Sequence, residues 1–295
     1  MDKLKIGYFA DGPWSHAAFE LLIKDSTISI EFIVPRTDTK DETLKKYSEK
    51  YDIDYLCPIK INSVEFYQKA LKYDCDLFIS MSFNQIFKNE IINLPKLKTI
   101  NCHAGKLPFY RGRNILNWVL INDEKEFGIT VHYIDEGIDT GDIILQRTFN
   151  ISDSDTYETL LKMAFVECAK ILYDAVKNIQ IGKYDRVKQN TIHPIGFYCG
   201  GRGVGDEIIN WNQSSREIFN FIRSICTPGP IARSYINGHE VKINKARFIS
   251  QAPSYMNTAG QIIEKTVNGY LVKTKDSFIE LLEVDTTLKV GDKLG

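Results

Sequence analysis

The sequence predicts an α/β fold in which a Rossmann-like, mostly parallel sheet with flanking helices precedes a small C-terminal antiparallel β domain. We expect that second domain to be an open barrel of the oligonucleotide/oligosaccharide-binding (OB-like) type. Short apolar runs alternate with segments of helical spacing in the first part of the chain. Short strands separated by two Asn-Gly turns occupy the last part, and a polar, glycine-rich segment lies between the two.

The bulk composition is that of an ordinary soluble protein. The chain has 295 residues, of which 43% are hydrophobic and 25% charged, so it can bury a sizeable core. We expect an α/β domain at 1–182, a linker at 183–205, and a β domain with one helix at 206–295. The formal net charge of −1 argues against a large basic surface, so we expect no nucleic-acid partner.

Cysteine spacing and hydropathy predict the compartment. The six cysteines show no C-x-x-C spacing, which favours reduced thiols in a cytoplasmic protein over a disulfide framework or a zinc site. The chain begins directly with a predicted strand, without the pattern of a signal peptide. No apolar run approaches the roughly 20 residues that span a bilayer, so we expect no membrane association.

Alternating patterns predict most of the regular elements. Strands are expected at 4–10, 28–35, 76–82, 97–101, 128–135 and 142–151, and helices from Asp11 or Ser15 to about Lys24, within 36–54, and at 64–73, 114–122 and 156–179. Asn114 is the expected cap of the helix that follows it. In the β domain a helix is expected from Ser214 or Ser215, and strands at 232–236, 240–248, 260–267, 270–274 and 278–284. Exposed strands of this domain allow a homodimer.

Three polar side chains lie where predicted strands end. Asn101 and His103 are two residues apart, so on extended backbone they project to the same side, toward the ligand crevice of an open α/β sheet. Cys102 then points into the core. Asp139 lies in the loop 136–141, whose two glycines allow a tight turn next to a ligand.

An amide, an imidazole and a carboxylate suit acyl transfer to an amine. The amide donates to the carbonyl oxygen that becomes negative, while the imidazole and carboxylate handle the proton of the amine. N-x-H alone is more often structural, and Asp139 alone is more often a turn former. His132 and His103 suggest a metal pair, but no third ligand has supporting spacing, so we expect no metal site.

Four motifs at fixed spacing argue against a purely structural role. N-x-H, L-P-x-Y-R-G, G-x-T-x-H and D-E-G-x-D-T-G-D resemble the formyltransferase family that uses 10-formyltetrahydrofolate as cosubstrate. That family includes methionyl-tRNA formyltransferase, glycinamide ribonucleotide transformylase and sugar N-formyltransferases. The resemblance covers nearly the whole chain and continues through I-N-W, T-P-x-P and the closing L-K-V-G-D-K-L-G.

The resemblance implies a role for each motif residue. Asn101 stabilises the transition state, His103 donates a proton, and Asp139 favours the protonated form of His103 and relays protons. The folate is expected against Gln85, Ile86, Phe87, Arg113, Asp135, Glu136, Gly137 and Ile138. The chain departs from the pattern at Ala104-Gly105-Lys106, where many relatives carry P-S-L or A-S-L. That change is expected to alter loop flexibility and charge without affecting the catalytic positions.

The acceptor amine is suggested by finer features. The form Y-R-G-R-N resembles sugar-nucleotide N-formyltransferases, and its two arginines fit anion or carbonyl recognition. Candidate substrate contacts are Asp11, Ser15, Asn84, Arg111 and Asn114. A nucleotide-sugar phosphate is one interpretation of Asp11 and Ser15, since helix N-termini favour anions, and a plain structural use is the other.

The expected function is therefore N-formylation of a dTDP-, UDP- or GDP-linked amino-deoxy sugar, in the biosynthesis of a surface polysaccharide such as lipopolysaccharide. The segment 36–54 is short and close to neutral, whereas tRNA formyltransferases carry a longer basic insertion in this area. The alternative is methionyl-tRNA formyltransferase. A folate- or nucleotide-binding module without catalysis is disfavoured because all three motif positions are intact.

Overall fold

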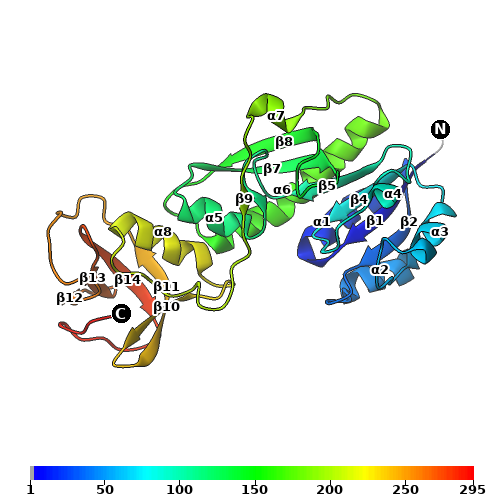
Figure 1. Ribbon diagram of the computed structural model, residues 1–295. Helices are drawn as coiled ribbons and strands as arrows, with labels where there is room; N and C mark the ends of the chain where they lie inside the picture. The colour runs from blue at the N-terminus through cyan, green and yellow to red at the C-terminus, as the bar shows by residue number, and fades with distance from the viewer. Residues whose placement is uncertain (1–2) are drawn as a thin grey trace. The chain divides into compact units, whose positions relative to one another are not determined.

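The computed structural model describes residues 3–295, which form two compact units (Figure 1). The first unit comprises the chain as far as Gly112 together with Gly128–Phe149 and Met163–Tyr198. The second comprises Arg113–Phe127, Asn150–Lys162 and Cys199–Gly295. These units run across the predicted domain boundaries at residues 182 and 205, which stay a prediction.

A seven-stranded sheet organises the first unit, in the order β3-β2-β1-β4-β5-β7-β8. Its strands are β1 (Leu4–Ala10), β2 (Ile28–Pro35), β3 (Asp54–Tyr55), β4 (Leu77–Met81), β5 (Thr99–His103), β7 (Glu126–Tyr133) and β8 (Ile143–Asn150). The pairs from β3 to β5 are parallel, and β7 runs antiparallel to β5. The predicted mostly parallel sheet is confirmed.

Helices lie between the strands of this sheet or follow its last strand. They are α1 (Gly12–Lys24), α2 (Glu42–Tyr51), α3 (Val64–Leu71), the short α4 (Asn89–Ile92), α6 (Tyr157–Gln180) and the short α7 (Gln189–Ile192). The side chain of Asp41 caps α2 by accepting from two backbone N–H groups, and that of Ser63 caps α3 by accepting from the N–H of Phe66. Helix α1 begins directly after Asp11, one of the two predicted starts, but the Asp11 side chain makes no capping hydrogen bond.

Aromatic packing fills one face of the sheet in the first unit. The ring of Phe9 lies edge-on to Phe78, with centroids 5.2 Å apart, and edge-on to Phe87, with centroids 5.0 Å apart. Phe32, Phe66 and further apolar residues complete this cluster. Such rings contribute both burial and favourable edge-to-face electrostatics, which fixes the strand that leads into the loop at residues 82–88.

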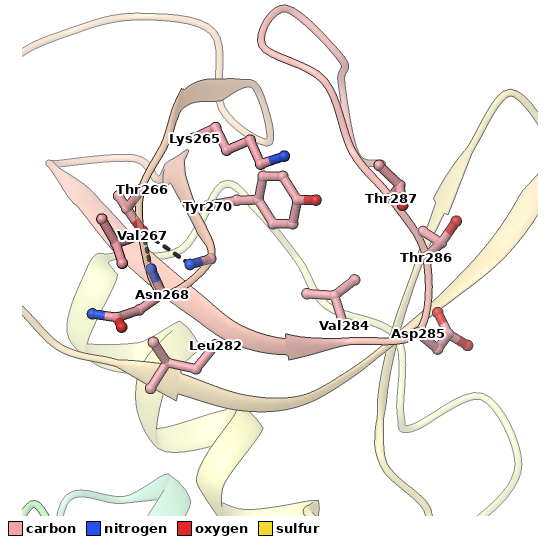
Figure 2. A pocket seen from close by; sticks show the side chains of 11 residues that line it. Lys265, Thr266, Val267, Asn268, Tyr270, Leu282, Val284, Asp285, Thr286 and Thr287 are labelled. Carbon is pink, nitrogen blue, oxygen red and sulfur yellow. Dashed lines mark hydrogen bonds between the residues drawn. The ribbon is translucent and has the colours of Figure 1, made fainter.

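The second unit contains a five-stranded antiparallel sheet in the order β10-β11-β14-β13-β12. Its strands are β10 (Ala232–Ile236), β11 (His239–Arg247), β12 (Ile262–Lys265), β13 (Tyr270–Lys273) and β14 (Phe278–Val284). Asn237 and Gly238 both have positive φ, as a tight hairpin turn requires. The predicted antiparallel β domain is confirmed. A hollow of about 700 Å³ opens beside the turn at 266–269 (Figure 2).

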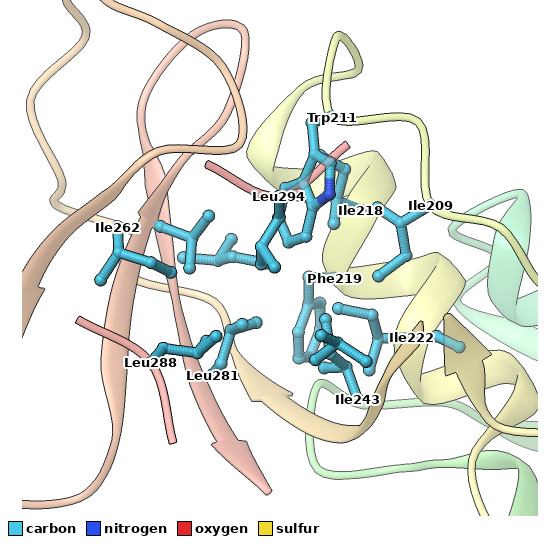
Figure 3. Close-up of a cluster of buried hydrophobic side chains, with 14 of the residues drawn as sticks. Ile209, Trp211, Ile218, Phe219, Ile222, Ile243, Ile262, Leu281, Leu288 and Leu294 are labelled. Carbon is cyan, nitrogen blue, oxygen red and sulfur yellow. The ribbon is translucent and has the colours of Figure 1, made fainter. Parts of the chain in front are cut away.

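Helix α8 (Ser215–Ile225) buries its apolar side against this sheet (Figure 3). Ser214 and Glu217 form a reciprocal capping box, which confirms the predicted start of the helix. Ile218 and Ile222 are fully buried among the sheet residues, and the indole N–H of Trp211 donates to Ser234 Oγ at 2.9 Å. The same unit contains α5 (Ile115–Ile121).

Residues 184–198, predicted as part of the linker, are packed within the first unit. The backbones of Val187 and Ile143 exchange two hydrogen bonds of 2.8 and 2.9 Å, and Tyr184 pairs with the hydroxyl of Tyr133 at 2.8 Å. A two-residue pairing of β6 (Arg111–Gly112) with β9 (Tyr198–Cys199) follows. No helix within residues 3–295 is both long enough and apolar enough to cross a lipid bilayer.

Candidate active site

The two predicted residues of β5 lie on one side of the strand. Asn101 is the register partner of His132 on β7, and His103 is the partner of Thr130. Cys102 points the other way, and its thiol lies 3.6 Å from the carbonyl of Cys168, as the strand alternation predicts. The strand continues through His103, two residues beyond the predicted end, so the sheet itself fixes both side chains.

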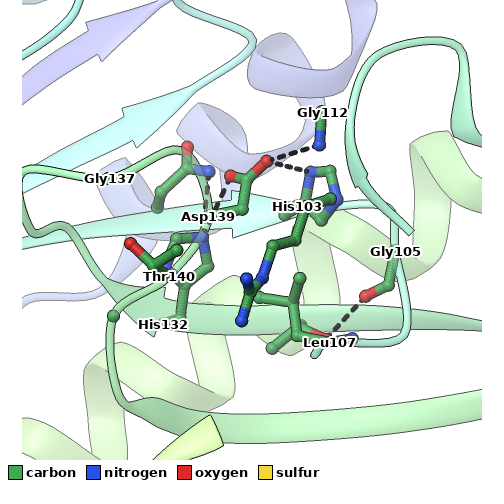
Figure 4. A network of polar contacts seen from close by, with 12 residues as sticks. His103, Gly105, Leu107, Gly112, His132, Gly137, Asp139 and Thr140 are labelled. Atoms are coloured by element: carbon green, nitrogen blue, oxygen red, sulfur yellow. Dashed lines mark hydrogen bonds and ion pairs between the residues drawn. The ribbon is translucent and has the colours of Figure 1, made fainter. Parts of the chain in front are cut away.

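Asp139 joins the two strands into one polar network (Figure 4). Its Oδ2 lies 3.6 Å from Nδ1 of His103, and its Oδ1 lies 3.4 Å from Nε2 of His132. Nδ2 of Asn101 lies 3.3 Å from the same His132 nitrogen. The amide, the imidazole and the carboxylate predicted from the sequence therefore belong to one connected group.

The hydrogen-bond partners of the two imidazoles show which ring nitrogens carry a proton. Nε2 of His103 lies 2.8 Å from the carbonyl oxygen of Tyr110, and Nδ1 of His132 lies 2.8 Å from its neighbour's carbonyl oxygen. Because a carbonyl only accepts, each of these nitrogens carries a proton. The remaining nitrogen of His103, Nδ1, faces the carboxylate of Asp139, so the ring lies between a protein carbonyl and a carboxylate.

Asp139 is held ionised although it is mostly buried. Its side chain is only 12% exposed. Burial alone would raise the pKa of Asp139, but the charges of His103 and His132 and the N–H of Gly112, 2.9 Å away, together lower that pKa well below its usual range. The carboxylate is therefore negatively charged throughout the neutral range and can stabilise a protonated imidazole.

The glycine at position 105 matters more than the sequence suggested. A Cβ at Gly105 would clash with the ring of His103 and with the carbonyl of Tyr110. The expectation that the Ala104-Gly105-Lys106 departure leaves the catalytic positions unaffected is therefore wrong. Thr130 secures the same loop by donating to the Gly105 carbonyl at 2.6 Å.

The residues expected against the folate pterin divide between surface and core. Ile86 is 66% exposed, and its carbonyl accepts from Asn62 Nδ2 at 2.7 Å. Phe87 is buried in the aromatic cluster, so its side chain belongs to the core. Gln85 accepts from the backbone of Ile61 at 3.1 Å, while Asn84 is exposed.

The loop between β7 and β8 is organised by its own side chains. Asp135 accepts from the N–H of Gly137 at 3.2 Å and from the hydroxyl of Thr140 at 2.5 Å. Glu136 accepts from the side chain of Asn89. Ile138 is 52% exposed, so it presents an apolar surface directly beside Asp139 in the chain. The loop is thus held by hydrogen bonds from within it and from Asn89.

The candidate phosphate contacts near α1 are engaged with the protein. Asp11 is buried and accepts a hydrogen bond from Thr39. Burial raises the pKa of Asp11, against the opposing effects of Thr39 and Arg36. Ser15 is fully buried and donates to the carbonyl of Gly12 at 2.8 Å. This placement favours the structural use of both residues, and their role as substrate contacts stays a prediction.

The candidates of the Y-R-G-R-N motif fall into both units. In the first, Arg111 donates to Oε1 of Gln189 through Nε at 3.1 Å and Nη2 at 2.6 Å. In the second, Arg113 and Asn114 are exposed. Asn114 accepts from the N–H of Arg202 at 3.0 Å and makes no side-chain cap to α5, so the predicted cap is wrong.

Sequence reasoning missed two participants in the network. His132 was considered only as a metal ligand or a core residue, although it lies between Asn101 and Asp139. Its place opposite Asn101 follows from the antiparallel register of β5 and β7, which no local motif encodes. Gln189 belongs to none of the sequence motifs, and its burial became visible only in the structure.

Comparisons with known proteins find relatives of both parts of the chain. The family model described as formyl transferase matches residues 29–176, and the model of the formyl transferase C-terminal domain matches residues 204–290. The methionyl-tRNA formyltransferase of Pelotomaculum thermopropionicum is 32% identical, over 88% of this chain and 84% of its own length. That of Syntrophomonas wolfei is 34% identical, over 85% and 77%.

Among solved structures, the sugar 3N-formyltransferase WlaRD superposes with a TM-score of 0.70 at 24% identity, covering 98% of this chain and all of that one. An N-formyltransferase from Helicobacter canadensis gives a TM-score of 0.73 at 23% identity, covering 96% of this chain and all of that one. At these identities the likeness establishes the shared fold. With the two family models covering most of its length, the chain belongs to the formyl transferase family.

Proposed function

We propose that this formyltransferase moves the formyl group of 10-formyltetrahydrofolate to the primary amine of a nucleotide-linked amino-deoxy sugar. The products are a formamido sugar nucleotide and tetrahydrofolate. The observation that carries the proposal is the connected group of Asn101, His132, Asp139 and His103, with contacts of 3.3 to 3.6 Å. The expected setting is surface polysaccharide biosynthesis.

Each side chain has a defined task in this reaction. The amine attacks the formyl carbon, and an N–H of Asn101 that is not directed at His132 donates to the oxygen that becomes negative. As the bond from the formyl carbon to the folate nitrogen breaks, His103 supplies a proton to that nitrogen. Asp139 stabilises the charged imidazole and takes up, through water, the proton that the amine loses.

The folate donor is supported by the structural neighbours. WlaRD was solved with 5-N-formyl-tetrahydrofolate and dTDP, and the Helicobacter canadensis enzyme with folinic acid and dTDP-3-aminofucose. Exposed Ile138 next to Asp139, and exposed Ile86 after β4, offer apolar contacts for a pterin beside the transfer centre. We therefore assign the loops 84–87 and 135–138 to the folate.

Charge pairing supports a small acceptor over tRNA. In the second unit Arg216 pairs with Asp123 and Asp153, and other pairs are Arg233 with Glu240, Lys245 with Glu283, and Arg247 with Glu280. The hollow beside the turn at 266–269 is lined by both Lys265 and Asp285. Cations that are paired in this way gain little from contact with a polyphosphate backbone.

Methionyl-tRNA formyltransferase is the second candidate, because the curated relatives at 32% to 34% identity carry that name. It predicts RNA binding whose affinity falls steeply with salt concentration, since phosphate contacts release counterions. It also predicts formylation of charged initiator tRNA at a rate that exceeds that of any amino sugar.

One experiment separates the two candidates. The purified protein is incubated with 10-formyltetrahydrofolate and either a panel of dTDP-, UDP- and GDP-linked amino sugars or methionyl initiator tRNA, and products are identified by mass spectrometry. We expect a formylated sugar nucleotide and no formylated tRNA, with a His103→Ala protein as the inactive control. Formylation of the tRNA alone would reverse the assignment.

A further inference from the structure

Gln189 of the short helix α7 is buried and fully hydrogen-bonded. Its side-chain Nε2 donates to the main-chain oxygen of Asp139 and to that of Gly141, each at 2.8 Å. Its Oε1 accepts from Arg111 at 3.1 and 2.6 Å. The side chain is only 4% exposed. One amide thus binds two loops of the transfer centre at once.

Each of these two loops helps to hold the carboxylate of Asp139 in place. Arg111 directly precedes Gly112, whose N–H donates to Asp139 Oδ2 at 2.9 Å. Asp139 itself has a φ of 54°, a backbone conformation that residues other than glycine rarely adopt. Surrounding contacts must therefore maintain it. Gln189 holds the main chain of Asp139 and, through Arg111, the segment that carries Gly112.

Contacts before and after Gln189 hold its backbone in place, so the position from which its side chain extends is fixed. Before it, Val187 pairs with Ile143 through two backbone hydrogen bonds, and Arg186 forms an ion pair with Asp142 at 3.1 Å. After it, the carbonyl of Phe197 accepts from the N–H of Arg111 at 3.2 Å. A Cβ at Gly196 would clash with the Arg111 guanidinium, which shows how closely the segment approaches.

We propose that Gln189 is a positioning residue for formyl transfer, whose side-chain amide sets the placement of Asp139 against His103. The inference rests on the proposed role of Asp139 and not on the identity of the amine acceptor. Gln189 touches neither imidazole, so it acts through the two loops that it joins. A displacement of about 1 Å at a reacting group can reduce the rate about 100-fold.

Gln189→Glu isolates this role because the new side chain has nearly the same shape. The carboxylate keeps a partner in Arg111, but it places an oxygen instead of an N–H against the carbonyls of Asp139 and Gly141. Gln189→Ala serves as a second variant, which removes every contact. Asn190→Ala, at the exposed next position of the same helix, is the matched control.

Two readouts distinguish positioning from mere support of the fold. We expect kcat of Gln189→Glu to fall about 10- to 100-fold, with KM for 10-formyltetrahydrofolate within about twofold of the wild type. Amide hydrogen exchange at Gly112 should become faster, while exchange in β1 and β4 stays unchanged. Gln189→Ala should change both readouts in the same direction, and Asn190→Ala neither. The exchange measurement needs no acceptor, so it decides the inference even if no amino sugar is formylated.

Wild-type kcat together with wild-type exchange at Gly112 in both variants would overturn the inference. Global unfolding of both variants by circular dichroism, or exchange that rises equally throughout the sheet, would also overturn it by leaving Gln189 a purely structural role.

Discussion

Oδ2 of Asp139 lies 3.6 Å from Nδ1 of His103 while it accepts the backbone N–H of Gly112 at 2.9 Å. The carboxylate is therefore fixed by the main chain before any ligand arrives. This preorganised charge beside an imidazole is what distinguishes the site from an ordinary pair of strand ends.

Replacing Asp139 by Asn tests the value of its charge. The new amide oxygen can still accept from Gly112, but it no longer stabilises a protonated imidazole. We expect kcat to fall about 100- to 10,000-fold, the range that general acid–base catalysis supplies. Steady-state formyl transfer measures this, and Asp174→Asn, which instead removes a carboxylate of α6 that is paired with Arg147, is the control. An activity within about threefold of the wild type would remove Asp139 from the mechanism.

The same carboxylate predicts how stability depends on pH. The folded-state pKa of Asp139 is lowered, since the nearby imidazoles and the Gly112 N–H outweigh the effect of burial. Its stabilising contribution is then fully present above the unfolded carboxyl pKa of about 4 and is lost as the pH falls through the lower, folded value. Urea unfolding at several pH values should show the difference between wild type and Asp139→Asn shrinking below about pH 4. A constant difference contradicts this sign.

Removing the imidazole of His103 should separate chemistry from donor binding. His103→Ala should lose turnover by about 100-fold or more, because it removes the proposed proton donor to the folate nitrogen. Calorimetric binding of 5-formyltetrahydrofolate should remain close to that of the wild type. His239→Ala, in an exposed position of β11, is the control. Loss of folate binding in parallel with turnover would assign His103 to the pocket and not to proton transfer.

Asn101 is predicted to act on the oxyanion. Asn101→Ala should reduce kcat about 100- to 1000-fold, the usual consequence of losing one preorganised donor. Asn101→Asp should be at least as damaging, because it places a negative charge beside the oxygen that becomes negative. Comparison of kcat and KM for the two variants measures this. A rise in KM with kcat unchanged in both variants would indicate that Asn101 binds substrate without stabilising the transition state.

An ion-pair cluster in the second unit predicts acid sensitivity of that unit. Burial alone would raise the pKa of Asp123, but Arg216 and Lys125 outweigh it and lower that pKa to about 2. The stabilisation is present above about pH 4 and disappears as the pH falls toward 2. Asp123→Asn should therefore lower Tm at pH 7 and leave it nearly unchanged near pH 2. Asp185→Asn, at an exposed position, should leave Tm nearly unchanged at both pH values.

The core of the β unit should respond to truncation at α8. Ile222 is fully buried against the sheet, so Ile222→Ala removes packed methyl groups and leaves a cavity. We expect a loss of about 2 to 5 kcal/mol in the free energy of unfolding, measured with urea. Val267→Ala at a fully exposed position should change it by less than about 0.5 kcal/mol. A small effect at Ile222 would mean that α8 does not support the sheet.

Local patterns were enough to predict much of the fold. The apolar runs gave β1 and β2 their bounds, the Ser214–Glu217 spacing marked the start of α8, and Asn237-Gly238 marked a hairpin. Asp11 and Asn114 do not cap the helices that follow them, because their side chains accept hydrogen bonds from Thr39 and from the N–H of Arg202 instead. Tertiary partners therefore overrode a local preference at those two positions.

Only those parts of the site that depend on neighbouring residues in the sequence could be predicted. Asn101 and His103 follow from strand alternation, and Asp139 from a motif, but the contact of His132 with both Asn101 and Asp139 depends on strand register. Gln189 is beyond sequence reasoning because its burial depends on how residues 184–198 dock.

A double-mutant cycle between His103 and Asp139 tests the central claim most directly. kcat is measured for formyl transfer by the wild type, His103→Ala, Asp139→Asn and the double variant, on the acceptor that the panel identifies. Because Asp139 acts largely by stabilising charged His103, the combined loss in the double variant should be clearly smaller than the product of the two single losses. Losses that multiply would mean that the two residues act independently and that the 3.6 Å contact has no part in the reaction.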